Sequence, residues 1–145
     1  MIDGSDGVVA SASPKYLNDA TKLPIACLLE FDTADVEVSM RAEEFISVLT
    51  HEIGHCLGLG TMWEYLDLVD REGGGDYVYR DGTNACREWR EATGCDGCPP
   101  VESNGPEGFI SSHWDQETMP MELMTGKRSL AQNYYAFDNV PINMK

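Results

Sequence analysis

Apolar and polar residues alternate in the first part of the chain. In residues 23–32 (LPIACLLEFD) every second residue from Ile25 to Phe31 is apolar on the same side, the two-residue repeat of a strand with one buried face. Residues 7–13 (GVVASAS) form a shorter run that predicts a second strand, which we expect to end at Pro14 because proline cannot donate to a ladder.

The apolar spacing changes to three and four residues from about Ser39, which is typical of an amphipathic helix. The positions concerned are Ala42, Phe45, Ile46, Leu49, Ile53, Cys56 and Leu57. Glu43 and Glu44 suit the positive N-terminal end of such a helix, and Gly58 with Gly60 suits its C-terminal cap. The pattern predicts one helix that ends before Gly58.

Residues 64–110 lack a sustained period and contain one turn sequence after another, such as REGGGDY, GCDGCPP and SNGPEG. The short run ACREWREA is expected to form one or two helical turns within them. Two strands, a long helix and a loop-rich second half indicate an α+β fold.

The composition limits the kinds of partner that the protein is expected to bind. The net charge of −15 and the pI of about 4.3 argue against nucleic acid and anionic membranes. No run approaches the roughly 20 apolar residues of a membrane span, so stable membrane insertion is not expected. The first residues, MIDGSDGVV, have neither the basic nor the apolar region of a signal sequence, so we do not expect them to be one. The sequence does not indicate an oligomeric state.

The candidate metal-binding and catalytic residues lie on the predicted helix, in the stretch LTHEIGHCLGLGTMW. His51 and His55 are four residues apart, so both imidazoles project from one face and can reach one zinc ion. Glu52 lies beside the first ligand, where it can take a proton from a metal-bound water. A helix with two histidines by chance is the alternative interpretation.

A catalytic zinc site needs a third protein ligand. Many enzymes with this motif place a histidine three residues after the glycine, but Thr61 stands there and is a poor zinc ligand. His113 is the remaining histidine of the three in the chain. Met124 follows in ELMTG, and a methionine turn beneath a three-histidine site is a hallmark of metzincins, although a lone methionine would be ordinary core filling.

Five segments together resemble the leishmanolysin-like zinc metallopeptidases of family M8, a metzincin branch with a long insertion before the third histidine. They are LPIACLLEFDTADV, VLTHEIGHCLGLGTMW, PPVESNGPEG, HWDQ and MELMTG. The resemblance extends from about Val8 to Gly126. Departures at both ends lead us to expect a fragment or truncated gene model of a longer protein.

The resemblance implies a secreted or cell-surface zinc endopeptidase that acts on proteins or peptides. One Zn²⁺ per chain would be bound by His51, His55 and His113, with Glu52 as general base and Met124 beneath the metal. The implied fold is metzincin-like: a twisted sheet with the active-site helix above it, a turn at Gly58, and a loop-rich lower subdomain.

This interpretation treats residues 1–145 as a single, partial catalytic domain. Residues 1–60 form its upper part with the strands and the active-site helix, and residues 61–110 form an irregular insert. Residues 111–145 supply the third zinc ligand, the methionine turn and the tail. Trp114 and Asp115 are candidates for orienting the third ligand, since ligating histidines usually donate their other N–H.

The secreted character of the relatives favours a disulfide from Cys86 to either Cys95 or Cys98. Cys27 and Cys56 are interpreted as small buried apolar residues.

Two other functions compete with the peptidase. In a zinc hydrolase of another class an acidic residue, Asp67, Asp70 or Glu72, would replace His113 as the third ligand. In the second alternative the chain is an inactive metal-binding fragment.

Overall fold

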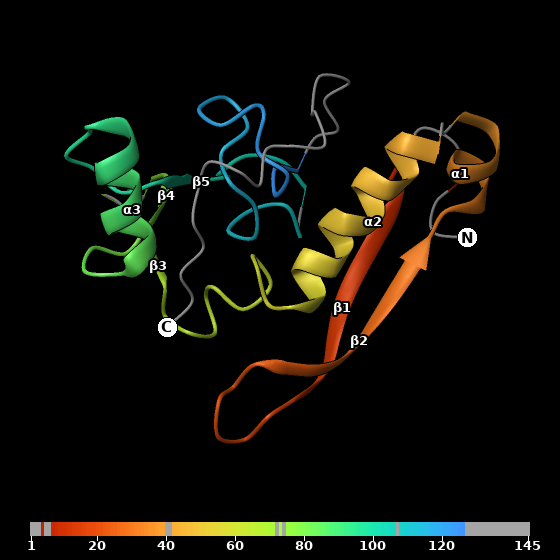
Figure 1. The fold of residues 1–145 in the computed structure, drawn as a ribbon, viewed down its shortest axis with the longest axis horizontal. Coiled ribbons are helices and arrows are strands. Elements are labelled where there is room, and N and C mark those ends of the chain that lie inside the picture. The colour runs from red at the N-terminus through yellow and green to blue at the C-terminus, as the bar shows by residue number, and fades with distance from the viewer. Residues whose placement is uncertain are drawn as a thin grey trace. The chain divides into compact units, whose positions relative to one another are not determined.

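The computed structural model describes residues 4, 7–39, 42–71, 73, 75–106 and 108–126. They form a mixed α+β structure with small antiparallel sheets and three helices (Figure 1), which confirms the predicted class. By its internal contacts the chain divides into two compact units, Met1–Thr61 and Met62–Lys145. The metzincin arrangement itself stays a prediction.

A hairpin and a helix make up the first unit. Strands β1 (Ala10–Leu17) and β2 (Pro24–Phe31) pair antiparallel, and helix α2 (Ala42–Cys56) packs along them (Figure 1). The prediction that the first strand stops at Pro14 is wrong. The strand continues to Leu17 because the register shifts just after Pro14, and an irregular strand in a two-stranded sheet can leave out a ladder donor.

The two cysteines of this unit form a disulfide, Cys27–Cys56, so their interpretation as unpaired apolar residues is wrong. Cys27 lies on the side of β2 that faces α2, and Cys56 is the last residue of that helix. The bond therefore joins the strand to the end of the helix. Ile25 shares the side of Cys27 by alternation, but it is 68% exposed near the hairpin end.

The predicted helix is preceded by a second, separate one. Helix α1 (Thr33–Ser39) follows Asp32, whose buried carboxylate accepts a hydrogen bond from the Ala34 N–H at 2.8 Å. That contact satisfies an N–H group at the start of the helix, the usual role of aspartate at this position. α2 then ends at Cys56, close to the predicted Gly58.

The second unit is more regular than its turn-rich sequence predicts. Strands β3 (Val69–Arg71), β4 (Tyr77–Tyr79) and β5 (Pro100–Val101) form an antiparallel sheet in that order. Its core is a cluster of buried residues: Trp63, Val69, Tyr79 and Val101, with Trp114 packed against them. Strands of two and three residues are too short for their alternation to be recognised in a sequence.

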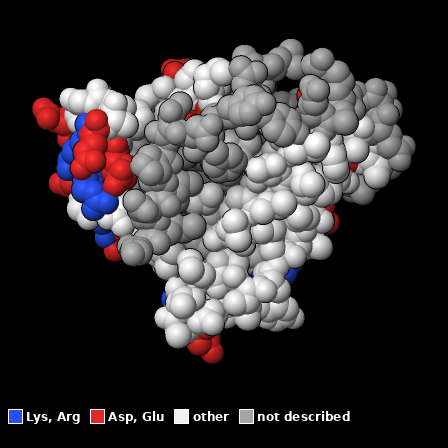
Figure 2. Space-filling model, in the orientation of Figure 1, with Lys and Arg blue, Asp and Glu red and all other residues white. Residues whose placement is uncertain are grey.

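Helix α3 (Asn84–Thr93) is ten residues long, where one or two turns were predicted. Thr83 caps it by accepting from the Cys86 N–H at 3.3 Å, and Gly94 ends it with a φ of 72°. Acidic and basic side chains lie side by side on it (Figure 2), among them Arg87 with Glu88 at 2.7 Å. These pairs place positive charge next to negative charge on the surface of α3.

The structure pairs Cys86 with Cys98 and places Cys95 on the surface as a free thiol. The choice between the two partners, which the sequence left open, therefore falls on Cys98. Among the described residues, no helix has the length and apolar character needed to cross a bilayer.

Candidate metal centre

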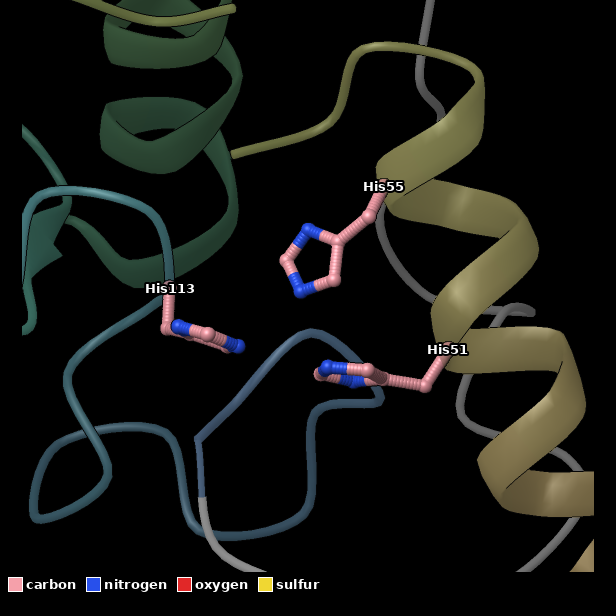
Figure 3. A group of neighbouring side chains, drawn as sticks. All are labelled: His51, His55 and His113. Carbon is pink, nitrogen blue, oxygen red and sulfur yellow. The ribbon is translucent and has the colours of Figure 1, made fainter. Parts of the chain in front are cut away.

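His51 and His55 project from one face of α2, one helical turn apart (Figure 3). Their ring centroids are 4.6 Å apart and the rings are nearly perpendicular, at 89°. His55 is buried and His51 is half-buried. The helix therefore presents two imidazoles at a separation at which both can reach one ion, as the sequence predicted.

The chain after α2 orients His55. Gly58 adopts a φ of 100°, a conformation that favours glycine, and turns the chain back beneath the helix end. This turn brings the Leu59 carbonyl to 2.8 Å from His55 Nδ1. Because a carbonyl can only accept, Nδ1 carries the proton and the ring tautomer is set.

Thr61 has a role that the sequence did not indicate. Its hydroxyl donates to the His55 carbonyl at 2.7 Å. That carbonyl lies in the last turn of α2, where backbone acceptors lack partners within the helix. Thr61 occupies the position at which related motifs have a ligand, but here it stabilises the helix end that carries one.

Glu52 is 6% exposed, and burial raises the pKa of its carboxyl from 4.5 to about 7. Its Oε2 atom is buried and has no hydrogen-bond partner among the described residues. A buried carboxylate oxygen without a partner is unfavourable in a purely structural role. Perturbed carboxyls of this kind gather at functional sites.

His113 is held in the second unit by two hydrogen bonds of the peptide group that joins it to Trp114. Its carbonyl accepts from the Glu102 N–H at 2.8 Å, next to β5. The following residue, Trp114, donates its N–H to the Met124 carbonyl at 2.9 Å and forms a parallel bridge with Thr125. The third histidine is thus fixed between β5 and the predicted methionine turn, and Met124 is buried at 5% exposure.

The imidazole of His113 has partners that the sequence did not identify. Nδ1 lies 3.1 Å from the Phe109 carbonyl and 3.0 Å from Ser112 Oγ. The two neighbours expected to orient this ring have other contacts. The centroid of the Trp114 ring lies 4.5 Å from that of Trp63, and the Asp115 carboxylate accepts a hydrogen bond from the Thr118 N–H at 2.8 Å. No pattern in the sequence distinguishes Phe109 or Ser112 as ligand-orienting residues.

The ligand atoms of His51, His55 and His113 lie within 4.8 Å of one another, so this group could hold a metal ion (Figure 3). A second group with the same spacing, Asp81 with Cys86 and Cys98, is explained by the disulfide between the two cysteines. The histidine group is consequently the stronger candidate for a metal centre.

The acidic residues of the rival interpretation have other contacts. Arg80 donates to Asp70 at 2.6 Å and also binds Asp67, and both carboxylates are at the surface. Glu72 lies outside the described residues.

The chain is α+β and carries two histidines and a buried glutamate on one helix. These features are typical of metal-dependent peptidases. A comparison with protein families supports this class and narrows it. The model of leishmanolysin, peptidase family M8, matches residues 2–140 of the 145-residue chain. The chain therefore belongs to the leishmanolysin family. No individual curated protein matches it.

Proposed function

We propose that the protein is a zinc-dependent endopeptidase in which His51, His55 and His113 bind one zinc ion. The observation that carries the proposal is the convergence of three imidazole ligand atoms within 4.8 Å. Three histidines are a known ligand set for catalytic zinc, and they leave a fourth coordination position open for water or substrate. Family membership supports zinc as the metal and proteins or peptides as the substrates.

The ring contacts support a choice of ligand atom. Nδ1 of His55 faces the Leu59 carbonyl, and Nδ1 of His113 faces the Phe109 carbonyl. Ligating histidines usually donate their second ring nitrogen to such an acceptor. We therefore assign Nε2 of both residues as the ligand atom.

Glu52 is proposed as the general base. Zinc held by the three histidines would supply Lewis acidity and would lower the pKa of a water molecule at its open position by several units. Oε2 of Glu52 would take a proton from the attacking water and would give it to the leaving amine. Burial raises the Glu52 pKa to about 7, and a cation nearby would favour the ionised carboxylate that a base requires.

Two further parts of the chain are given roles. Met124, buried where the chain passes beside Trp114, would form the apolar floor beneath the metal. A peptide substrate would bind in extended form along β1, which pairs only with β2 among the described strands. The family also supports a secreted or cell-surface location.

The test measures zinc per chain after dialysis, together with cleavage of casein, for wild type and three variants. We expect one zinc ion in wild type, a sharp loss in His113→Ala, and retention in Glu52→Gln. Glu52→Gln should lower cleavage by about 10²–10⁴-fold, because it removes proton transfer and leaves the ligands.

Asp70→Ala is the matched control and should keep both zinc and cleavage. If His113→Ala kept its zinc and Asp70→Ala lost it, an acidic third ligand would replace His113. Zinc binding without cleavage in wild type would support an inactive metal-binding protein, and a folded wild type without zinc would refute the proposal.

A further inference from the structure

Phe109 contacts the candidate ligand His113 in two ways. Its ring centroid lies 5.2 Å from that of the imidazole, at an interplanar angle of 32°. Its carbonyl lies 3.1 Å from His113 Nδ1. One residue of an irregular turn is therefore placed to influence both the plane of the imidazole and the position of its proton.

The same phenyl ring fills the space in front of Gly126. A Cβ atom added to Gly126 would lie 2.5 Å from Phe109 Cδ1 and 2.9 Å from Cε1, closer than real atoms approach. Gly126 has no positive φ, so its backbone accepts other residues and only the phenyl ring forbids a side chain. The glycine is required here for close approach rather than for a turn.

Gly126 follows directly on the residues that fix the His113 segment. Met124 accepts from the Trp114 N–H at 2.9 Å, and Thr125 forms a bridge with Trp114. The segment that holds the backbone after His113 thus continues into the residue that admits the phenyl ring. Backbone and ring are positioned by the same short stretch of chain.

We propose that Phe109 is a positioning residue for His113, and that Gly126 provides the space that allows its ring to do so. The phenyl ring restricts rotation of the imidazole, and the carbonyl accepts the Nδ1 proton, so that Nε2 presents its lone pair in one direction. As a statement about metal binding, the proposal rests on the proposed function of His113 as a zinc ligand.

The hydroxyl of Ser112 supports the same tautomer. Ser112 Oγ donates to the Gly108 carbonyl at 2.6 Å and lies 3.0 Å from His113 Nδ1. With its proton committed to a carbonyl, the hydroxyl can only accept from the imidazole. The tautomer therefore does not depend on the phenyl ring, and a change of the Phe109 side chain tests ring orientation alone.

The experiment is a double-variant cycle of Phe109→Ala and Gly126→Ala in the full chain. Two properties are measured: the zinc dissociation constant, by competition with a chelator, and the NMR resonances of the His113 ring in the metal-free protein. Each single variant should weaken zinc binding by about 10–100-fold, the range for residues that orient ligands, and should shift the His113 resonances. In the double variant Gly126→Ala should add less than about twofold, because the ring that its methyl would strike is absent.

Gly97→Ala is the matched control, since a Cβ at Gly97 meets nothing within 4 Å and its φ is not positive. It should change neither property. Phe109→Val takes the place of Phe109→Ala in the cycle if the smaller side chain prevents folding, because it keeps part of the apolar volume and lacks the Cδ and Cε atoms that the methyl group of Gly126→Ala would strike.

Equal losses from Gly126→Ala with and without the phenyl ring would overturn the proposal, as would wild-type zinc affinity and His113 resonances in Phe109→Ala. If wild type bound no zinc, the proposed function would fail and the resonances of the metal-free protein would decide the positioning role by themselves. A shift of those resonances in both single variants, absent in Gly97→Ala, would then support it.

Discussion

The two units hold their candidate zinc ligands by different means. In the first, His51 and His55 are neighbours because a helix repeats every 3.6 residues, so a local rule places both rings. In the second, His113 is placed by backbone bonds to Glu102 and, through Trp114, to Met124. The first arrangement follows from spacing, whereas the second depends on segments that the sequence does not show to be adjacent.

This difference predicts which substitutions will disturb the ligand geometry of each unit. A helix keeps its spacing after most substitutions, so the first unit should lose its ligand geometry mainly when the helix loses its attachment. The second unit should lose it when the packing around His113 changes.

Removal of the Cys27–Cys56 disulfide should have the largest effect, because it joins α2 to β2 immediately after His55. The two cysteines are 29 residues apart, and closing a loop of that length stabilises a fold by roughly 3–4 kcal/mol in the chain-entropy treatment. The free energy of unfolding of Cys27→Ala/Cys56→Ala, measured with urea by the helical circular-dichroism signal, should fall by that amount.

The control for this variant is Cys95→Ala, which removes an exposed free thiol. A surface change of this kind should stay within about 0.5 kcal/mol of wild type. Equal stabilities of Cys95→Ala and the double variant would show that the disulfide does not anchor the helix.

Much of the first unit could be predicted from sequence because its elements are long enough to show a period. The predicted limits of strand β2 and helix α2 are close to the observed ones. The continuation of β1 through Pro14 could not be predicted from the sequence, since it depends on which strands lie beside β1. The Cys27–Cys56 pairing depends on the packing of β2 against α2, and no sequence spacing encodes that packing.

The site divides in the same way. His51, Glu52 and His55 form a recognisable motif, and the scarcity of histidine pointed to His113. The residues around these ligands escaped prediction: Thr61, Phe109 and Ser112 act through a hydroxyl, a ring face or a carbonyl, which many residues in many positions could supply. Only the structure shows that these groups meet a histidine.

Tyr79 offers a pH-dependent test of the second unit. The residue is 8% exposed, and the centroid of its ring lies 5.4 Å from that of Trp114. Burial raises the pKa of Tyr79 from 10.0 to about 12. Below pH 10 both the folded and the unfolded states keep the phenolic proton, and the stabilisation is complete. As the pH rises from about 10 to 12, the unfolded state loses the proton first, so stability falls by up to about 3 kcal/mol.

The measurement is the free energy of unfolding from tryptophan fluorescence at pH 9 and at pH 11.5, for wild type and Tyr79→Phe. The phenylalanine variant keeps the ring and cannot ionise, so its stability should change less between the two pH values. The same decline in both proteins would assign the alkaline loss to other groups and refute the role of Tyr79.

The smallest effect is expected at Thr61, which tests the local arrangement of the first unit. Thr61→Val keeps the shape of the side chain and removes the hydroxyl that donates to the His55 carbonyl at 2.7 Å. That carbonyl also accepts from the Gly58 N–H at 3.0 Å, so it keeps a partner and the loss should be only about 0.5–1 kcal/mol. Thr61→Ser retains the donor and should behave as wild type in urea unfolding. If the serine variant lost as much stability as the valine variant, the methyl group would be responsible, and the hydroxyl would have no part in holding the helix end that carries His55.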